Sequence, residues 1–249
     1  MLALLKIVFY VPIYNGLIFL IGVLPGHSVG TAVILVTVLV KLLLFPLSRK
    51  ATLFQTEMKL HEPELNRIKE RYKNDKQAQG KAIMEFYRER RINPFSGILP
   101  IFIQIPIVIA LYYVFYGGGL PAIDAGLLYS FVPVPTPDMH FLGLDMLEKS
   151  LLLALLAGAS QFLQAHIVMP PPPPKTDTAP SLGSDLARGM HLQMKYIFPI
   201  FMAFIAYAVS GAVALYFITS SIFTVLQELY IRRSLAKTHK QTVTGNRNS

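Results

Sequence analysis

The hydrophobic positions of this chain gather in long runs rather than in the alternating pattern of a half-buried strand. Spanning the hydrocarbon of a bilayer takes about 20 apolar residues in a helix, and runs of this length without alternation exclude a closed barrel. The longest run, Tyr196 to Ile231, breaks near Ser210–Gly211, which predicts two spans joined by a tight turn. The pattern therefore predicts an all-α integral membrane protein with five transmembrane helices, at about residues 28–48, 96–117, 149–169, 192–209 and 212–232.

The N-terminal residues are apolar but interrupted. The segment Ile7–Leu24 is hydrophobic enough to span, yet Pro12 and Asn15 break the run and its tyrosines suit a membrane interface. No small-residue cleavage site follows, so the segment does not resemble a signal peptide. We predict that residues 1–27 form an interfacial helix on the membrane surface, and a sixth span is the alternative.

The charges of the loops predict the orientation. Residues 49–91 hold twelve Lys and Arg against seven acids, the loop 117–148 holds four acids and neither Lys nor Arg, and the tail after Ile231 has five Lys and Arg and no acid. Loops rich in Lys and Arg stay in the cytoplasm. We therefore predict a multi-pass protein of the cell membrane with residues 49–93 and the C-terminus in the cytoplasm and the 117–148 loop outside.

Three polar segments complete the domain organisation. Residues 51–92 carry apolar residues at helical spacing, with Asn74–Asp75 as a break and Pro63 as a kink, which predicts an antiparallel helical hairpin in the cytoplasm. The run of prolines that opens residues 170–188 predicts an extended linker. Residues 236–249 are predicted to be a basic disordered tail, which leaves 28–235 as the core.

Composition supports a membrane protein and gives little sign of an enzyme. The chain is 53% hydrophobic and only 15% charged, whereas a soluble domain carries roughly 25% charged residues. It has no cysteine, which excludes disulfides and thiolate metal sites. The six histidines are scattered and no hydrolase or phosphate-binding motif is present. We predict no catalytic residue, no metal and no cofactor.

Polar residues inside the predicted spans are the most informative feature, because polar groups are costly at membrane depth. Lys41 lies well inside the first span, and we expect Thr37 and Ser48 to share its helical face. Other spans add Gln104, Ser160, Gln164, Tyr216, Ser220 and Thr224. One interpretation is that these groups join helices by hydrogen bonds. The other is a hydrophilic cavity, open to the cytoplasm, with Lys41 as its fixed charge.

Several motifs resemble the YidC/Oxa family of membrane protein insertases. The second predicted span and the residues before it contain NPFSGILPIFIQIPIVIALYY, which begins at Asn93 and resembles the second core helix of that family. The segment Phe45–Lys50 resembles the end of the first core helix, and Ala214–Gln227 resembles the last one. The similarity extends from about residue 10 to residue 235.

This resemblance implies five core helices around a hydrophilic groove that opens to the cytoplasm and to lipid. Lys41 matches the groove cation, where many members have Arg, and Phe217 stands where some members have Tyr. The chain resembles the short form, which lacks a large extracytoplasmic domain. The groove residues implied are Lys41, Thr37, Gln104, Ser160, Gln164, Tyr216, Phe217, Ser220 and Thr224.

The resemblance also implies the function, which is to help nascent membrane proteins enter and fold in the lipid bilayer. Acidic residues of a translocating tail would be drawn to Lys41 in the groove. The hairpin and the basic tail would contact the ribosome and the targeting machinery, and the Sec translocon is a further partner. A small membrane transporter or channel is the alternative, and it usually carries an internal repeat, which we do not find.

Overall fold

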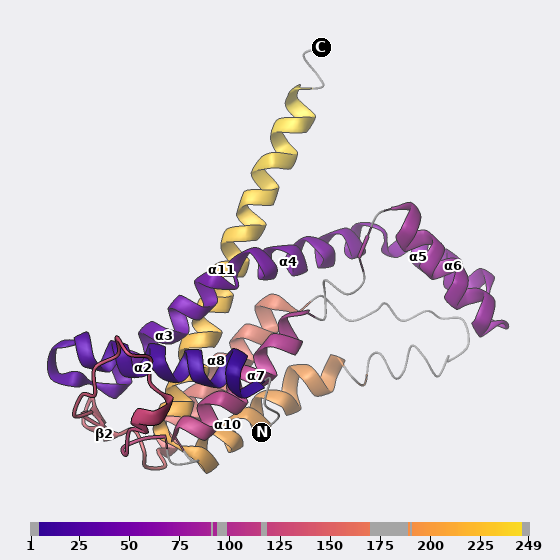
Figure 1. The fold of residues 1–249 in the computed structure, drawn as a ribbon. Coiled ribbons are helices and arrows are strands. Elements are labelled where there is room, and N and C mark those ends of the chain that lie inside the picture. The colour runs from indigo at the N-terminus through magenta and orange to yellow at the C-terminus, as the bar shows by residue number, and fades with distance from the viewer. Residues whose placement is uncertain are drawn as a thin grey trace. The chain divides into compact units, whose positions relative to one another are not determined.

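The computed structural model describes residues 5–90, 92–93, 99–115, 119–169, 189 and 191–245 (Figure 1). These residues are mostly helical, in agreement with the predicted all-α class. The chain divides into two compact units, residues 1–43 with 105–230 and residues 44–104 with 231–249. Two helices run from one unit into the other, α7 (Leu99–Phe115) and α11 (Gly211–Gly245).

The first unit contains the apolar helices. They are apolar around most of their circumference, as expected of helices that face lipid or one another. In chain order the elements that lie wholly in this unit are η1 (Lys6–Tyr10), α2 (Val11–Val23), η2 (Pro25–His27), α3 (Val29–Leu43), η4 (Ala125–Leu127), β1 (His140–Phe141), β2 (Leu144–Asp145), α8 (Leu151–Val168), η5 (Gln193–Ile197) and α10 (Phe198–Val209).

Three of the described helical segments are long and apolar enough to cross a membrane, or four if α3 and the helix that follows it form one broken span. The three are Lys6–Val23, Leu151–Val168 and Gly211–Leu235, while Gln104–Phe115 and Gln193–Val209 are apolar but shorter. A multi-pass membrane protein is therefore supported, and the predicted count of five spans is not established. Lys6–Val23 has the length of the sixth span that the sequence left open, so its interfacial position stays a prediction.

The first predicted span ends earlier than expected. The sequence placed its end near residue 48, but α3 ends at Leu43 and α4 (Phe45–Leu60) begins after a break at Leu44. The reason is Pro46, which lacks an N–H and therefore fits the first turn of a new helix better than the interior of an old one. Ser48 is thus on α4, and the expected shared helical face with Thr37 and Lys41 is not formed.

The segment of residues 119–150, here called the cap, is a folded element rather than an open loop. Its strands β1 and β2 pair in antiparallel register. The Val29 N–H donates to the Asp138 carbonyl at 2.9 Å, and the Gly211 N–H donates to the Glu148 carbonyl at 2.8 Å. The cap therefore satisfies backbone groups at the starts of both α3 and α11, which helix ends leave without intrahelical partners.

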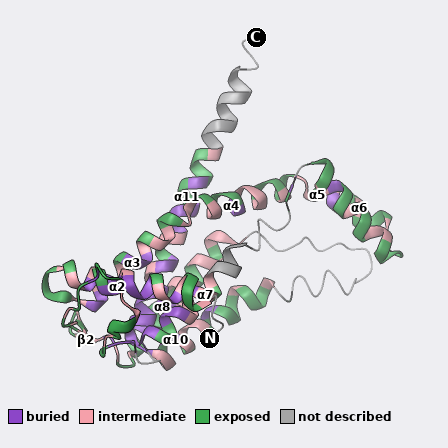
Figure 2. Cartoon of the chain, in the orientation of Figure 1, coloured by how far each residue is buried: buried purple, intermediate pink, exposed green. Residues whose placement is uncertain are grey.

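The cap is also joined to α2 through one buried amide. Asn15 is 2% exposed, and its side-chain NH₂ donates to the carbonyls of Val11 at 2.9 Å and Leu127 at 2.8 Å. Its side-chain oxygen accepts the Tyr129 N–H at 2.6 Å. Buried residues run along α2 on both sides of this position (Figure 2). Asn15 interrupts the apolar run in sequence because it fastens the cap to this helix.

The second unit contains the helical hairpin. The helix α4 is followed by α5 (Glu62–Arg71) and α6 (Lys76–Glu89). Pro63 occupies the first turn of α5, so the predicted kink is a break between two helices at His61. Asp75 caps α6 by accepting the N–H groups of Gln77 and Ala78, which explains the break that Asn74–Asp75 predicts.

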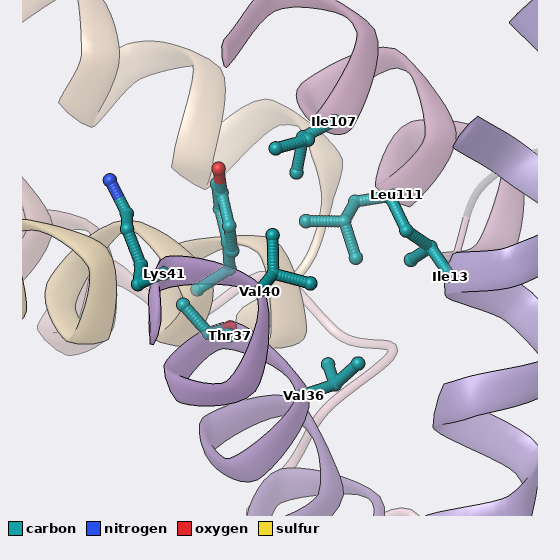
Figure 3. A pocket seen from close by; sticks show the side chains of 8 residues that line it. Ile13, Val36, Thr37, Val40, Lys41, Ile107 and Leu111 are labelled. Carbon is teal, nitrogen blue, oxygen red and sulfur yellow. The ribbon is translucent and has the colours of Figure 1, made fainter. Parts of the chain in front are cut away.

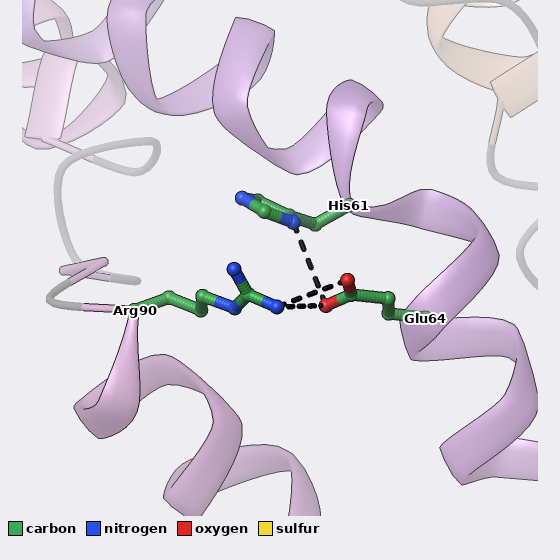
Figure 4. A network of polar contacts seen from close by, with 3 residues as sticks. All are labelled: His61, Glu64 and Arg90. Carbon is green, nitrogen blue, oxygen red and sulfur yellow. Dashed lines mark hydrogen bonds and ion pairs between the residues drawn. The ribbon is translucent and has the colours of Figure 1, made fainter.

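The hairpin has a small core of its own. Leu65, Phe86 and Ile92 are buried together, and the partly buried residues packed against them are Phe54, Met58, Ile68, Ile83 and Tyr87. Burial also raises the pKa of the Tyr87 hydroxyl above its ordinary value. At the surface, Arg90 donates to both carboxylate oxygens of Glu64 at 3.0 and 2.9 Å, and His61 Nδ1 lies 3.6 Å from the same carboxylate (Figure 4). Packing rather than this exposed pair holds α5 against α6.

The C-terminal segment differs from its prediction. Residues 236–249 were expected to be disordered, but α11 continues to Gly245. The residues from 232 to 244 include neither glycine nor proline, so nothing in the sequence stops the helix before Gly245. The predicted linker at 170–188 lies outside the described residues, as does the start of the NPFSG motif from Pro94 to Ile98.

We expect Asn15→Leu to release the cap from α2. Leucine has the same branched side-chain skeleton as asparagine but leaves the Leu127 carbonyl and the Tyr129 N–H without their partner, at about 1–3 kcal/mol for each group. The purified variant in detergent should melt at a lower temperature and be cleaved within the cap by protease that spares the parent. Val23→Ala, at a position of the same helix that is 61% exposed, is the control. Unchanged protease resistance of Asn15→Leu would contradict the clamp.

We expect Phe86→Ala to unfold the hairpin alone. Removing a buried phenyl ring from a core this small costs about 3–5 kcal/mol, which few remaining contacts offset. Limited proteolysis should then cut within α5 and α6, while the melting temperature of the apolar helices stays unchanged. Met84→Ala, 58% exposed on the same helix, should behave like the parent. Protease resistance equal to that control would show that the cluster does not stabilise the hairpin.

Candidate functional site

A small hollow with a cavity volume of about 20 Å³, which is room for about one water molecule, lies between helices of the first unit. Its walls come from α2, α3, α7 and α11, and five of the eight lining side chains are aliphatic (Figure 3). The eight are Ile13, Val36, Thr37, Val40, Lys41, Ile107, Leu111 and Tyr216. The surface that lines the hollow is almost wholly apolar, and the polar atoms of Thr37, Lys41 and Tyr216 contribute little to it.

Lys41 supplies the charge of this hollow. Positions 36, 37, 40 and 41 lie on one face of α3, because residues three or four apart in a helix are neighbours. The Lys41 ammonium donates to the Thr224 hydroxyl oxygen at 3.1 Å, although the two residues are 183 positions apart. In Figure 3 the ammonium end points away from Ile13 and Leu111. The cation is thus turned from the apolar wall toward α11.

Thr37 lies one turn before Lys41 and is buried. Its side chain is 3% exposed, and its hydroxyl donates to the Val33 carbonyl at 2.6 Å. A threonine hydroxyl has a single proton to donate, so the lone pairs of Thr37 remain as acceptors at the hollow. Thr37 therefore adds polarity without adding charge.

The polar stripe predicted for the last span lies on α11. Tyr216 lines the hollow, Ser220 is 5% exposed, and the Thr224 hydroxyl donates to the Ser220 carbonyl at 2.8 Å. Phe217 is 2% exposed and its ring centroid lies 5.3 Å from that of Tyr216. Phe217 packs inside the unit and is not among the residues that line the hollow.

The remaining predicted groove residues are not at this hollow. Ser160 and Gln164 lie on α8, which packs against α10. The Ser160 hydroxyl donates to the Ala157 carbonyl at 2.8 Å, and Gly158 approaches Ala203 so closely that an added Cβ would lie 2.9 Å from the alanine Cβ. Small residues at this interface favour close helix packing rather than a cavity. Gln104 belongs to the second unit and does not line the hollow.

Sequence reasoning missed the apolar half of the site. Ile13, Ile107 and Leu111 carry no signal that separates them from other core residues, since only the fold turns them toward Lys41. It also missed Ser221 on α11, whose buried Oγ has no hydrogen-bond partner among the described residues. Polar residues on this helix thus extend beyond the stripe that faces Lys41.

The side chains around the hollow are suited to the binding of an anionic group. Among the described residues no group of three or more His, Asp or Glu side chains is placed to hold a metal ion. The hollow itself contains no carboxylate or imidazole able to transfer a proton. An ammonium with neutral hydroxyl neighbours is instead suited to attract and hold an anionic group.

Comparisons with known proteins agree with the motifs. The family described as 60Kd inner membrane protein matches residues 20–239. A relative from Fusobacterium nucleatum, called membrane protein insertase YidC, is 36% identical over 204 residues, which are 82% of this chain and 86% of the relative. Relatives of the same name from Francisella philomiragia and Francisella tularensis are 33% identical over 213 residues, which are 85% of this chain and 34% of theirs.

The family match covers most of the chain and includes every residue that lines the hollow except Ile13. The Fusobacterium relative is of similar length, whereas the chain spans about a third of each Francisella relative. Both the motifs and the extent of these matches lead to one conclusion: the chain belongs to the 60Kd inner membrane protein family, which is the YidC/Oxa family.

Proposed function

We propose that the chain is a membrane protein insertase that binds nascent membrane proteins and helps them enter and fold in the bilayer. The observation that carries this proposal is Lys41, whose ammonium lies beside an apolar hollow and is partnered by a neutral hydroxyl. Each of the relatives described above carries the insertase name. The transporter or channel alternative finds no support in those names.

The two sides of the hollow have different tasks in this proposal. Lys41 attracts acidic residues in the polar tail of a client, because a positive charge in a medium of low dielectric acts strongly on a nearby anion. The aliphatic side, with Val36, Val40 and Leu111, receives the apolar segment of the same client. The free energy of transferring a polar tail out of water is lower where the tail meets an ammonium and hydroxyl groups than in bare hydrocarbon.

The proposed orientation places the cap outside and the hairpin and C-terminus in the cytoplasm. The cap holds the starts of α3 and α11, so these two ends belong to one side of the membrane. Its segment from 117 to 148 has acids and neither Lys nor Arg, whereas residues 49–91 are rich in both. Closure by the cap on one side leaves the opposite side for the entry of clients.

The partners proposed for the cytoplasmic parts follow from charge. The hairpin and the basic end of α11 carry the excess of Lys and Arg. Basic surfaces of this kind bind the phosphates of RNA and are sensitive to salt. We assign the ribosome, the targeting machinery and the Sec translocon as contacts of these two elements.

The charge of Lys41 tests the proposed function. Lys41→Arg should retain the insertion of a client with an acidic tail into liposomes, while Lys41→Ala should slow it about tenfold or more, since a charge-assisted hydrogen bond is worth about 1.5–3 kcal/mol. Leu39→Ala, 54% exposed on the same helix, is the matched control. A second client, whose acidic residues are replaced by asparagine, should be inserted at the same rate by all three variants. Full activity of Lys41→Ala on acidic tails would refute the role of the charge.

Water access to the stripe on α11 tests the cavity. Thr224 is partly exposed, and Ile222 and Leu226 on the other side of the helix are 51% and 61% exposed. With no native cysteine, Thr224→Cys should react with a membrane-impermeant maleimide added from the cytoplasmic side, whereas Ile222→Cys and Leu226→Cys in lipid should not, because thiolate needs water. Protection of all three would indicate interhelical packing, and labelling of Thr224→Cys from both sides would favour a channel.

A further inference from the structure

The contact between Lys41 and Thr224 has a direction that the insertase proposal alone does not explain. The Thr224 hydroxyl gives its proton to the Ser220 carbonyl at 2.8 Å. Its oxygen therefore meets the Lys41 ammonium, 3.1 Å away, only as an acceptor. The carbonyl of α11 thus orients the lone pairs of Thr224 toward the cation.

Lys41 keeps its positive charge uncompensated in this arrangement. An ammonium has three N–H donors, and the Thr224 oxygen accepts one of them. None of the ion pairs seen in the hairpin and the cap includes Lys41. The lining of the hollow also contains no acid. A neutral oxygen thus stands where a carboxylate would bind a lysine.

A carboxylate has reason to displace that oxygen. Hydrogen bonds between two charged groups are shorter and roughly twice as strong as those between neutral groups. Exchange of the Thr224 oxygen for a client carboxylate loses the weaker contact and gains the stronger one. Thr224 keeps its own hydrogen bond to Ser220 throughout, so it need not be left without a partner when Lys41 turns to the client.

We propose that Thr224 is a positioning residue that holds the Lys41 ammonium on α11 and occupies, with a neutral oxygen, the place that a client carboxylate takes. This inference rests on the proposed insertase function and specifies one step of it. Thr224 thereby selects for acidic clients, since a neutral polar tail gains little by displacing a neutral oxygen.

Filling this place permanently tests the inference. Thr224→Asp puts an internal carboxylate beside Lys41, and because it is tethered it competes with clients at a high effective concentration. Thr224→Asp should insert a client with an acidic tail about tenfold more slowly than Thr224→Asn does. Asparagine has nearly the same shape as aspartate but carries no charge. A client without acids should be inserted equally by the two variants.

The stability of the purified variants separates this effect from a structural one. In the Lys41 background, Thr224→Asp should melt at a higher temperature than Thr224→Asn, because the new carboxylate has a partner. With Lys41→Ala the order should reverse, because the same carboxylate then lies partly buried and unpaired. Equal melting temperatures of Thr224→Asp and Thr224→Asn in both backgrounds would overturn the proposed contact.

Exchange of the two partners tests the inference if Thr224→Asp fails to fold. The double variant Lys41→Thr with Thr224→Lys moves the ammonium to α11 and the hydroxyl to α3. It should insert a client with an acidic tail about tenfold faster than Lys41→Thr alone, because the two side chains meet at one place. Absence of recovery would overturn the inference.

The insertase proposal and this inference fail in different ways. If Lys41→Ala and Thr224→Asp both insert acidic clients at the parental rate, the groove charge itself has no role. If Lys41→Ala is impaired while Thr224→Asp matches Thr224→Asn, the charge acts without Thr224 and the present inference alone is wrong.

Discussion

An ammonium among apolar helices must find an acceptor, and this constraint organises the helices around Lys41. The first unit offers aliphatic side chains on most sides of the hollow, so the cation has to reach toward α11. There Thr224 accepts a hydrogen bond because its own proton is committed to Ser220. Ser220 and Thr224 therefore act together, since a single hydroxyl without an oriented neighbour would hold the cation less firmly.

The same requirement for hydrogen-bond partners explains the cap. Helices that begin in an apolar unit expose N–H groups, and the carbonyls of Asp138 and Glu148 accept those of Val29 and Gly211. The same holds for the buried side chain of Asn15, whose NH₂ group and oxygen both have hydrogen-bond partners. These bonds therefore satisfy the backbone at the starts of both α3 and α11.

The sequence predicted the features that depend on local chemistry. Hydrophobic runs gave the apolar helices, and the break at Ser210 occurs where glycine follows serine between α10 and α11. Asp75 caps α6 at the predicted turn. Lys41 was a candidate because a cation inside an apolar run is costly wherever the helix lies, and it is the residue that faces the hollow.

Features that depend on tertiary contacts were not predictable in this way. Ser160 has the same hydroxyl as Ser220, yet it lies on a helix whose small residues pack against α10. Ile13 lines the hollow because the N-terminal helix folds back onto α3, which no periodicity reveals. The first span was predicted to end near residue 48 because the apolar run continues to that point, whereas α3 ends at Leu43. Pro46 was visible in the sequence but was not used to place the end.

The choice of threonine as partner for Lys41 has a physical logic of its own. An acid at position 224 would satisfy the ammonium more strongly, but the pair would be neutral and its field would fall off quickly with distance. An aliphatic residue there would leave the cation without an acceptor on α11. Threonine lies between these extremes, since it stabilises the position of the ammonium while leaving its charge available. A binding site for transient anionic groups needs both properties, because a cation that is already neutralised attracts no client and one that is unsupported does not hold its place.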